Sequence, residues 1–113
     1  MKRSRGLWRV WVSEAARDAL MAAADAANPD ETGGVLVGVV LKRGEDTGRP
    51  WVTHAVEVPS RKSDRNHYEL PAGARRRVVM RLRKSDSRLG YLGDWHSHPV
   101  NVGPSPTDIE SID

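Results

Sequence analysis

Residues 33–41 read Gly-Gly-Val-Leu-Val-Gly-Val-Val-Leu, and this stretch decides the fold. Its apolar side chains stand at both odd and even positions, which is typical of a strand covered on both faces. We therefore expect the central strand of a sheet that is flanked by helices. Two acidic residues, Asp30 and Glu31, precede this strand and are separated from it by Thr32.

The residues before the central strand predict a strand followed by a helix. Residues 7–12 are rich in β-forming side chains. Ser13 is a favoured N-cap, and residues 15–27 are dense in alanine, the strongest helix former. Asn28-Pro29 ends the predicted helix. Its apolar stripe consists of Ala16, Leu20, Ala23 and Ala27.

The residues after the central strand predict a hairpin. Glycine and proline between positions 42 and 50 are typical of a turn, and residues 51–58 return as a strand. Strict alternation places four side chains of this strand on one face: Val52, His54, Val56 and Val58. Because His54 lies on an apolar face, we expect it to be structural.

The rest of the chain predicts a polar loop over 60–70, a helix over 74–84 and a strand over 89–98. Pro71 is a candidate first residue of that helix, whose inward side chains are Val78, Val79 and Leu82. Residues 103–108 predict a loop that begins a final helix. The order strand–helix–strand–strand–helix–strand–helix indicates an α/β or α+β fold with a mixed sheet.

Composition limits the class of protein. A chain of 113 residues is one domain, 1–113. No stretch approaches the roughly 18 apolar residues of a membrane span, and no signal-peptide segment follows the basic start, so we expect a cytoplasmic protein. The chain has no cysteine, which excludes disulfides, thiolate zinc sites and a cysteine nucleophile. The net charge of +3 leaves two partners open, nucleic acid or an acidic protein.

The motif most specific for chemistry is Asp94-Trp95-His96-Ser97-His98-Pro99. Side chains two apart on a strand project from one face, as two ligands of one metal ion must. The alternative is a polar pair on an exposed strand. Asp94 shares this parity, either as support for the histidines or as a solvated neighbour, whereas Trp95 is expected in the core.

A second motif, Ser105-Pro106-Thr107-Asp108, has a structural and a functional interpretation. Serine, proline and an acid in this order favour a helix start. The same turn would hold Asp108 near the two histidines, and two His and one Asp are a legitimate zinc ligand set. A base for a metal-bound water is then needed, and spacing does not choose between Glu31 and Asp30, either of which could simply be a solvated carboxylate.

Three segments together, 31–38, 96–99 and 105–108, resemble the JAMM (JAB/MPN+) family of zinc metalloproteases. The family pattern is a Glu at a strand start, a later His-Ser/Thr-His-Pro and then Ser-x-x-Asp. The resemblance covers most of the chain, from Trp8 onward, and implies a curved mixed sheet flanked by helices, in a compact bacterial or archaeal member.

The resemblance also implies roles for individual residues. His96, His98 and Asp108 look like the ligands of one zinc ion per chain. Glu31 looks like the general base for the zinc-bound water, and Ser105 like the group that holds the developing oxyanion. The implied reaction is hydrolysis of a peptide or isopeptide bond.

The family further implies a substrate with a Gly-Gly tail, a ubiquitin-like modifier or its precursor, and an association with activating and conjugating enzymes. A sulfur-carrier protein as substrate, a non-catalytic scaffold and a nucleic-acid module are the alternatives. The absence of cysteine excludes the cysteine-built second zinc of many eukaryotic members. Because many family cores continue past the Ser-x-x-Asp segment, we expect either that the C-terminal part is truncated or that a partner chain or an unusual fold completes the sheet.

Two features are left without a firm role. His67, in the polar loop, is either a surface residue or a substrate contact. The arginines of the helix at 74–84 form either a solvated face or a docking surface for an acidic partner.

Overall fold

The computed structural model describes residues 10–41, 48–60, 67–98 and 107–110, the last by backbone alone. The strands are β1 (Trp11–Val12), β2 (Gly33–Leu41), β3 (Arg49–Glu57), β4 (Gly90–Ser97) and β5 (Thr107–Glu110), and the helices are α1 (Glu14–Ala27) and α2 (Ala74–Arg83). The sheet order is β1-β3-β2-β4-β5, with β1 parallel to β3 and every other pair antiparallel. The predicted mixed α/β sheet with β2 at its centre is therefore confirmed.

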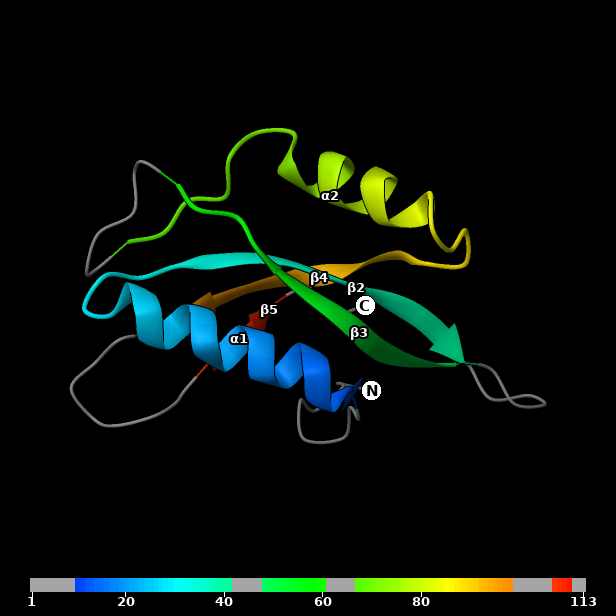
Figure 1. The fold of residues 1–113 in the computed structure, drawn as a ribbon, viewed down its shortest axis with the longest axis horizontal. Coiled ribbons are helices and arrows are strands. Elements are labelled where there is room, and N and C mark those ends of the chain that lie inside the picture. Colours follow the sequence, from blue (N-terminus) through cyan, green and yellow to red (C-terminus); the bar gives the residue numbers. More distant parts are fainter. Residues whose placement is uncertain (1–9, 42–47, 61–66, 99–106, 111–113) are drawn as a thin grey trace, which may run out of the picture.

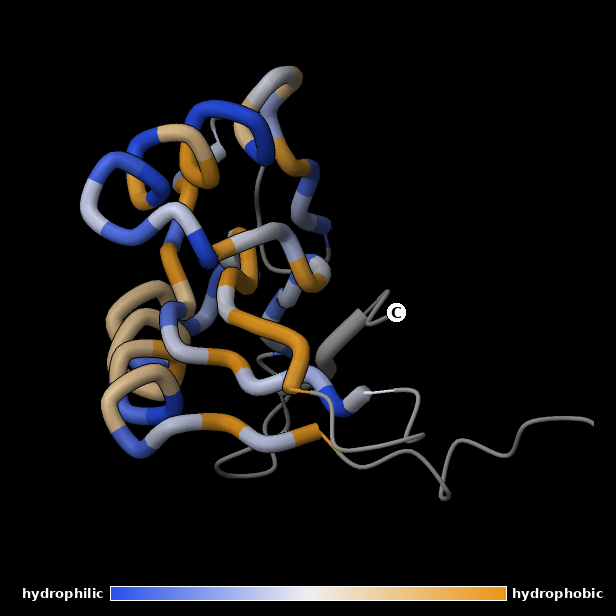
Figure 2. The backbone as a smooth tube through the Cα atoms, turned by 90° about the vertical axis from the view of Figure 1, so that its right-hand side faces the viewer, coloured by the Kyte–Doolittle hydropathy of each residue, from blue (hydrophilic) through white to orange (hydrophobic). Residues whose placement is uncertain are grey.

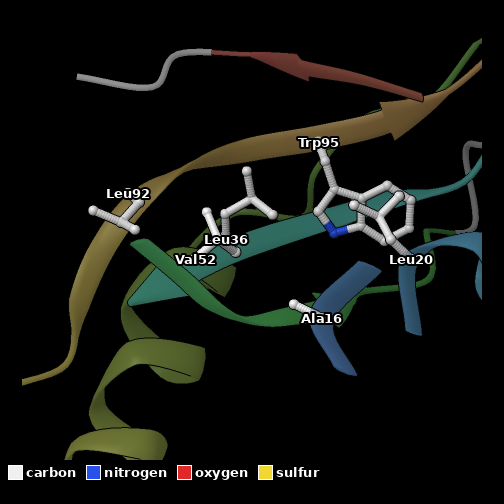
Figure 3. Packing of buried hydrophobic residues seen from close by; sticks show 6 residues of the cluster. All are labelled: Ala16, Leu20, Leu36, Val52, Leu92 and Trp95. Carbon is white, nitrogen blue, oxygen red and sulfur yellow. The ribbon is translucent and has the colours of Figure 1, made fainter. Parts of the chain in front are cut away.

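Two apolar clusters cover the two faces of the sheet, because neighbouring residues of β2 point in opposite directions. On one face α1 packs through Ala16 and Leu20 against Leu36 and Trp95 (Figure 3). On the other face α2 covers a second cluster, whose buried members are Val35, Val37, Val78 and Leu89. Figure 1 shows the strands lying between the two helices.

The helix starts follow local chemistry. Ser13 caps α1 as predicted, since its Oγ accepts a hydrogen bond from the backbone of Ala16 at 3.0 Å. The prediction that Pro71 begins α2 is wrong. The N-cap is Gly73, whose φ of 79° lies in the left-handed region that favours glycine.

The prediction that four alternating residues of β3 share one face is wrong at Val52. Thr53 is an extra residue between Val52 and His54, whose partners on β2 are adjacent. Such a bulge shifts the alternation by one position. Val52 consequently packs on the α1 side, whereas Val56 and Val58 pack on the α2 side.

The predicted final helix is also wrong over its described part. Residues Thr107–Glu110 form β5, which pairs antiparallel with β4. Ladder hydrogen bonds to an existing strand edge override a helix-start motif that only local side chains support. Ser105, Pro99, the predicted strand before residue 10 and the turn residues 42–47 lie outside the described residues. Neither described helix is long and apolar enough to cross a membrane.

Candidate metal centre

His96 and His98 come together at the end of β4. Their ring centroids are 4.6 Å apart, with an angle of 74° between the planes. His96 pairs with Gly33 on β2, and Asp94 pairs with Val35. Because Val35 belongs to the cluster under α2, the two imidazoles project from the α2 face of the sheet.

The residue opposite His96 on the other side is Asp108, its partner in the β4–β5 ladder. The sequence motif thus brings Asp108 to the histidine, although through a strand rather than a helix. Among the side chains that the structure describes, no three His, Asp or Glu groups form a cluster that could hold a metal. The imidazoles and a carboxylate at this register position nevertheless fit zinc in chemical type, since tetrahedral zinc takes nitrogen and oxygen ligands.

Glu31 is half-buried and directly precedes the residue that fastens β2 to β4. The backbone N–H of Thr32 donates to Ser97 Oγ at 3.0 Å, and the N–H of Ser97 donates to the Thr32 carbonyl at 2.8 Å. The Thr32 hydroxyl donates to Glu57 at 2.7 Å. Glu31 therefore stands next to these bonds, at the end of the sheet where Gly33 pairs with His96. Asp30, which is exposed, lies one residue further from the Thr32–Ser97 hydrogen bonds.

Asp94 has a role that neither interpretation of the sequence anticipated. It accepts two hydrogen bonds from the guanidinium of Arg75 and one from the Tyr91 hydroxyl at 2.8 Å. The hydrogen bond to Asp94 raises the pKa of Arg75, and burial together with that carboxylate raises the pKa of Tyr91. Arg75 stands in the first turn of α2, so this cluster ties α2 to the strand that carries the histidines.

Tyr68 is the residue at this end of the sheet that sequence reasoning missed. A Cβ built on Gly33 would lie 2.7 Å from the Tyr68 ring, so the ring rests on Gly33, the pairing partner of His96. Its hydroxyl donates to the Val58 carbonyl at 2.5 Å. Burial, with the charges of Asp94 and Glu57, raises the pKa of Tyr68 to about 12. The only sequence signal was a lone aromatic residue in a polar loop.

The remaining histidines, His54 and His67, make other contacts. His54 is half-buried, with Nδ1 2.8 Å from the Thr53 hydroxyl, which agrees with a structural residue. His67 is exposed and lies 3.9 Å from Glu69. A contact between His67 and substrate stays a prediction.

The protein is an α+β domain in which a five-stranded mixed sheet lies between two helices and a His-x-His pair stands at the end of an inner strand. The family model for prokaryotic homologs of the JAB domain matches residues 13–113. The chain therefore belongs to this family. A search of the curated proteins found no match.

Proposed function

We propose that this protein is a zinc-dependent peptidase or isopeptidase that cleaves after the Gly-Gly tail of a ubiquitin-like modifier or its precursor. The observation that carries the proposal is the convergence of His96 and His98 on one face, with Asp108 opposite His96 in the ladder. Membership of the JAB family supports the same reaction class. When bound there, zinc would polarise the scissile carbonyl and acidify a water molecule.

The chain's own residues would do the rest. Glu31 would accept a proton from the attacking water and return it to the leaving amine, which a carboxylate within hydrogen-bond reach can do. The Thr32–Ser97 bonds would hold Glu31 in place for this transfer. Ser105 would donate to the carbonyl oxygen as negative charge develops on it, a contribution of typically about 3 kcal/mol in other enzymes.

The first test is metal content. We expect about one zinc per chain after dialysis, measured by elemental analysis, and its loss in the His96→Ala/His98→Ala variant. Because His67 is exposed and outside the proposed ligand set, His67→Ala is the matched control and should keep the zinc. A wild-type protein without zinc affinity would exclude the metallopeptidase and favour a non-catalytic scaffold.

The second test is cleavage. Ubiquitin-like and sulfur-carrier proteins, each fused through Gly-Gly to a reporter, would be incubated with the protein with and without chelator. We expect chelator-sensitive release, and a loss of roughly 100-fold or more in Glu31→Gln with zinc still bound. Retained turnover in the zinc-loaded Glu31→Gln protein would show that another group, such as Asp30, is the base.

A further inference from the structure

The positive charge in the first turn of α2 has no explanation in the stability of the helix, whereas Arg81 and Arg83 stand in the last turn, where the helix dipole favours positive charge. Every charged residue of α2 is an arginine, at positions 75, 76, 77, 81 and 83. Three of them stand in the first turn, where the helix dipole disfavours positive charge, and no side chain caps this end. By contrast, α1 begins with a serine cap and an acidic first turn.

Part of this charge is held in place by the fold. Arg75 binds Asp94, Arg77 donates to the Ala72 carbonyl at 3.2 Å, and Arg83 donates to the Leu89 carbonyl at 2.8 Å. These contacts bind three of the five arginines to the fold itself. The other two arginines of α2, Arg76 and Arg81, are exposed.

The outward side of α2 also carries an apolar residue at its centre. Arg76, Met80 and Lys84 are spaced by four residues, so they form one exposed line along the helix. Met80 is 51% exposed. We call this line, together with the neighbouring exposed Arg81, the basic face. Figure 2 shows the turns of α2 as mostly hydrophilic.

Within the described part of the chain, the two helices on opposite faces of the sheet carry charge of opposite sign. The exposed acids of α1 are Glu14, Asp18 and Asp25, with Arg17 as its one basic residue, whereas α2 has no acid. An approaching acidic surface is thus attracted to α2 and repelled by α1, which orients the encounter.

We propose that the basic face binds a partner protein through an acidic segment that has an apolar side chain at its centre. Carboxylates of the segment would pair with Arg76, Arg81 and Lys84, and the apolar side chain would cover Met80. A protein segment fits better than nucleic acid, because the exposed Met80 at the centre of the face offers nothing to a phosphate but can be covered by an apolar side chain. The proposal is separate from the His96–His98 pair and does not rest on cleavage.

Direct binding tests this surface. The probes are a labelled acidic peptide of about ten residues with a central leucine, the same peptide with serine at the centre, and a DNA duplex of equal charge. Fluorescence anisotropy should show salt-dependent binding of the leucine peptide, tighter than of the duplex. Arg76→Glu should weaken this binding roughly tenfold. Arg17→Glu, an equal charge change on exposed α1, should leave it nearly unchanged.

Met80→Ala tests the apolar centre. This substitution should weaken binding of the leucine peptide about threefold and leave binding of the serine peptide unchanged, since only the leucine side chain loses buried apolar contact. Circular dichroism would check that Arg76→Glu, Arg17→Glu and Met80→Ala are each folded. The proposal is overturned if no peptide binds at low salt, if Arg17→Glu weakens binding as much as Arg76→Glu, if the duplex binds more tightly, or if Met80→Ala does not distinguish the peptides.

Discussion

Tyr68 reports on the end of the sheet beside the candidate centre, because its ring lies on Gly33 and its hydroxyl must be protonated to donate to Val58. Its pKa is raised from the usual 10.0 to about 12. A raised pKa in the folded state means that the associated stability is complete below pH 10 and is lost as the pH rises through about 12.

We therefore expect the free energy of unfolding, measured in urea, to fall between pH 10 and pH 12. Tyr68→Phe should cost about 1 kcal/mol near neutral pH, the typical worth of one hydrogen bond, and should make the alkaline loss shallower. Tyr91→Phe removes the other tyrosine with a raised pKa and should still retain the part of the alkaline loss that belongs to Tyr68. Equal alkaline slopes in wild type and Tyr68→Phe would contradict the assignment.

At the scale of an element, β2 depends on glycine at positions where neighbouring strands leave no space for a side chain. A Cβ on Gly34 would lie 1.9 Å from the Val56 carbonyl oxygen, a backbone atom of the paired strand β3. The backbone cannot yield there without breaking the ladder that joins these two strands. At Gly90, in contrast, a Cβ meets nothing within 4 Å.

Gly34→Ala should therefore destabilise the protein by about 3 kcal/mol or more, at the upper end of the cost of overpacking. Gly90→Ala should change the free energy of unfolding by less than about 0.5 kcal/mol. Urea titrations of both variants compare them directly. A Gly34→Ala protein as stable as Gly90→Ala would mean that the β2–β3 pairing differs from the one described.

The elements also show what a sequence pattern can predict. The apolar run of β2 and the alanine stripe of α1 predicted both elements, because burial there depends on residue type alone. Which side chains of β3 share a face could not be predicted, because Thr53 forms a bulge and a bulge appears only when two strands are paired. For Asp108, the sequence predicted the wrong secondary structure, a helix start, but correctly placed the residue beside His96. Pairing with the distant strand β4, rather than local capping, determined the conformation there.

At the scale of the whole molecule, the candidate centre would join two strands that the rest of the fold holds unequally. β4 lies between β2 and β5 and is tied to α2 through Asp94, whereas β5 is a four-residue strand at the edge of the sheet. A metal ion held by His96, His98 and Asp108 would connect this edge to the core. The proposed centre would thus link the strands as well as take part in catalysis.

Zinc should therefore raise the stability of the folded chain. A ligand that binds only the folded state at 100 times its Kd adds about 2.7 kcal/mol to the free energy of unfolding. We expect an increase of this order in urea titrations with added zinc, and its reversal by chelator. His96→Ala/His98→Ala should show no response, whereas His67→Ala should respond as the wild type does. A zinc response that survives the double substitution would place the metal elsewhere, since the imidazoles of this pair, 4.6 Å apart, are the ones that the fold brings together.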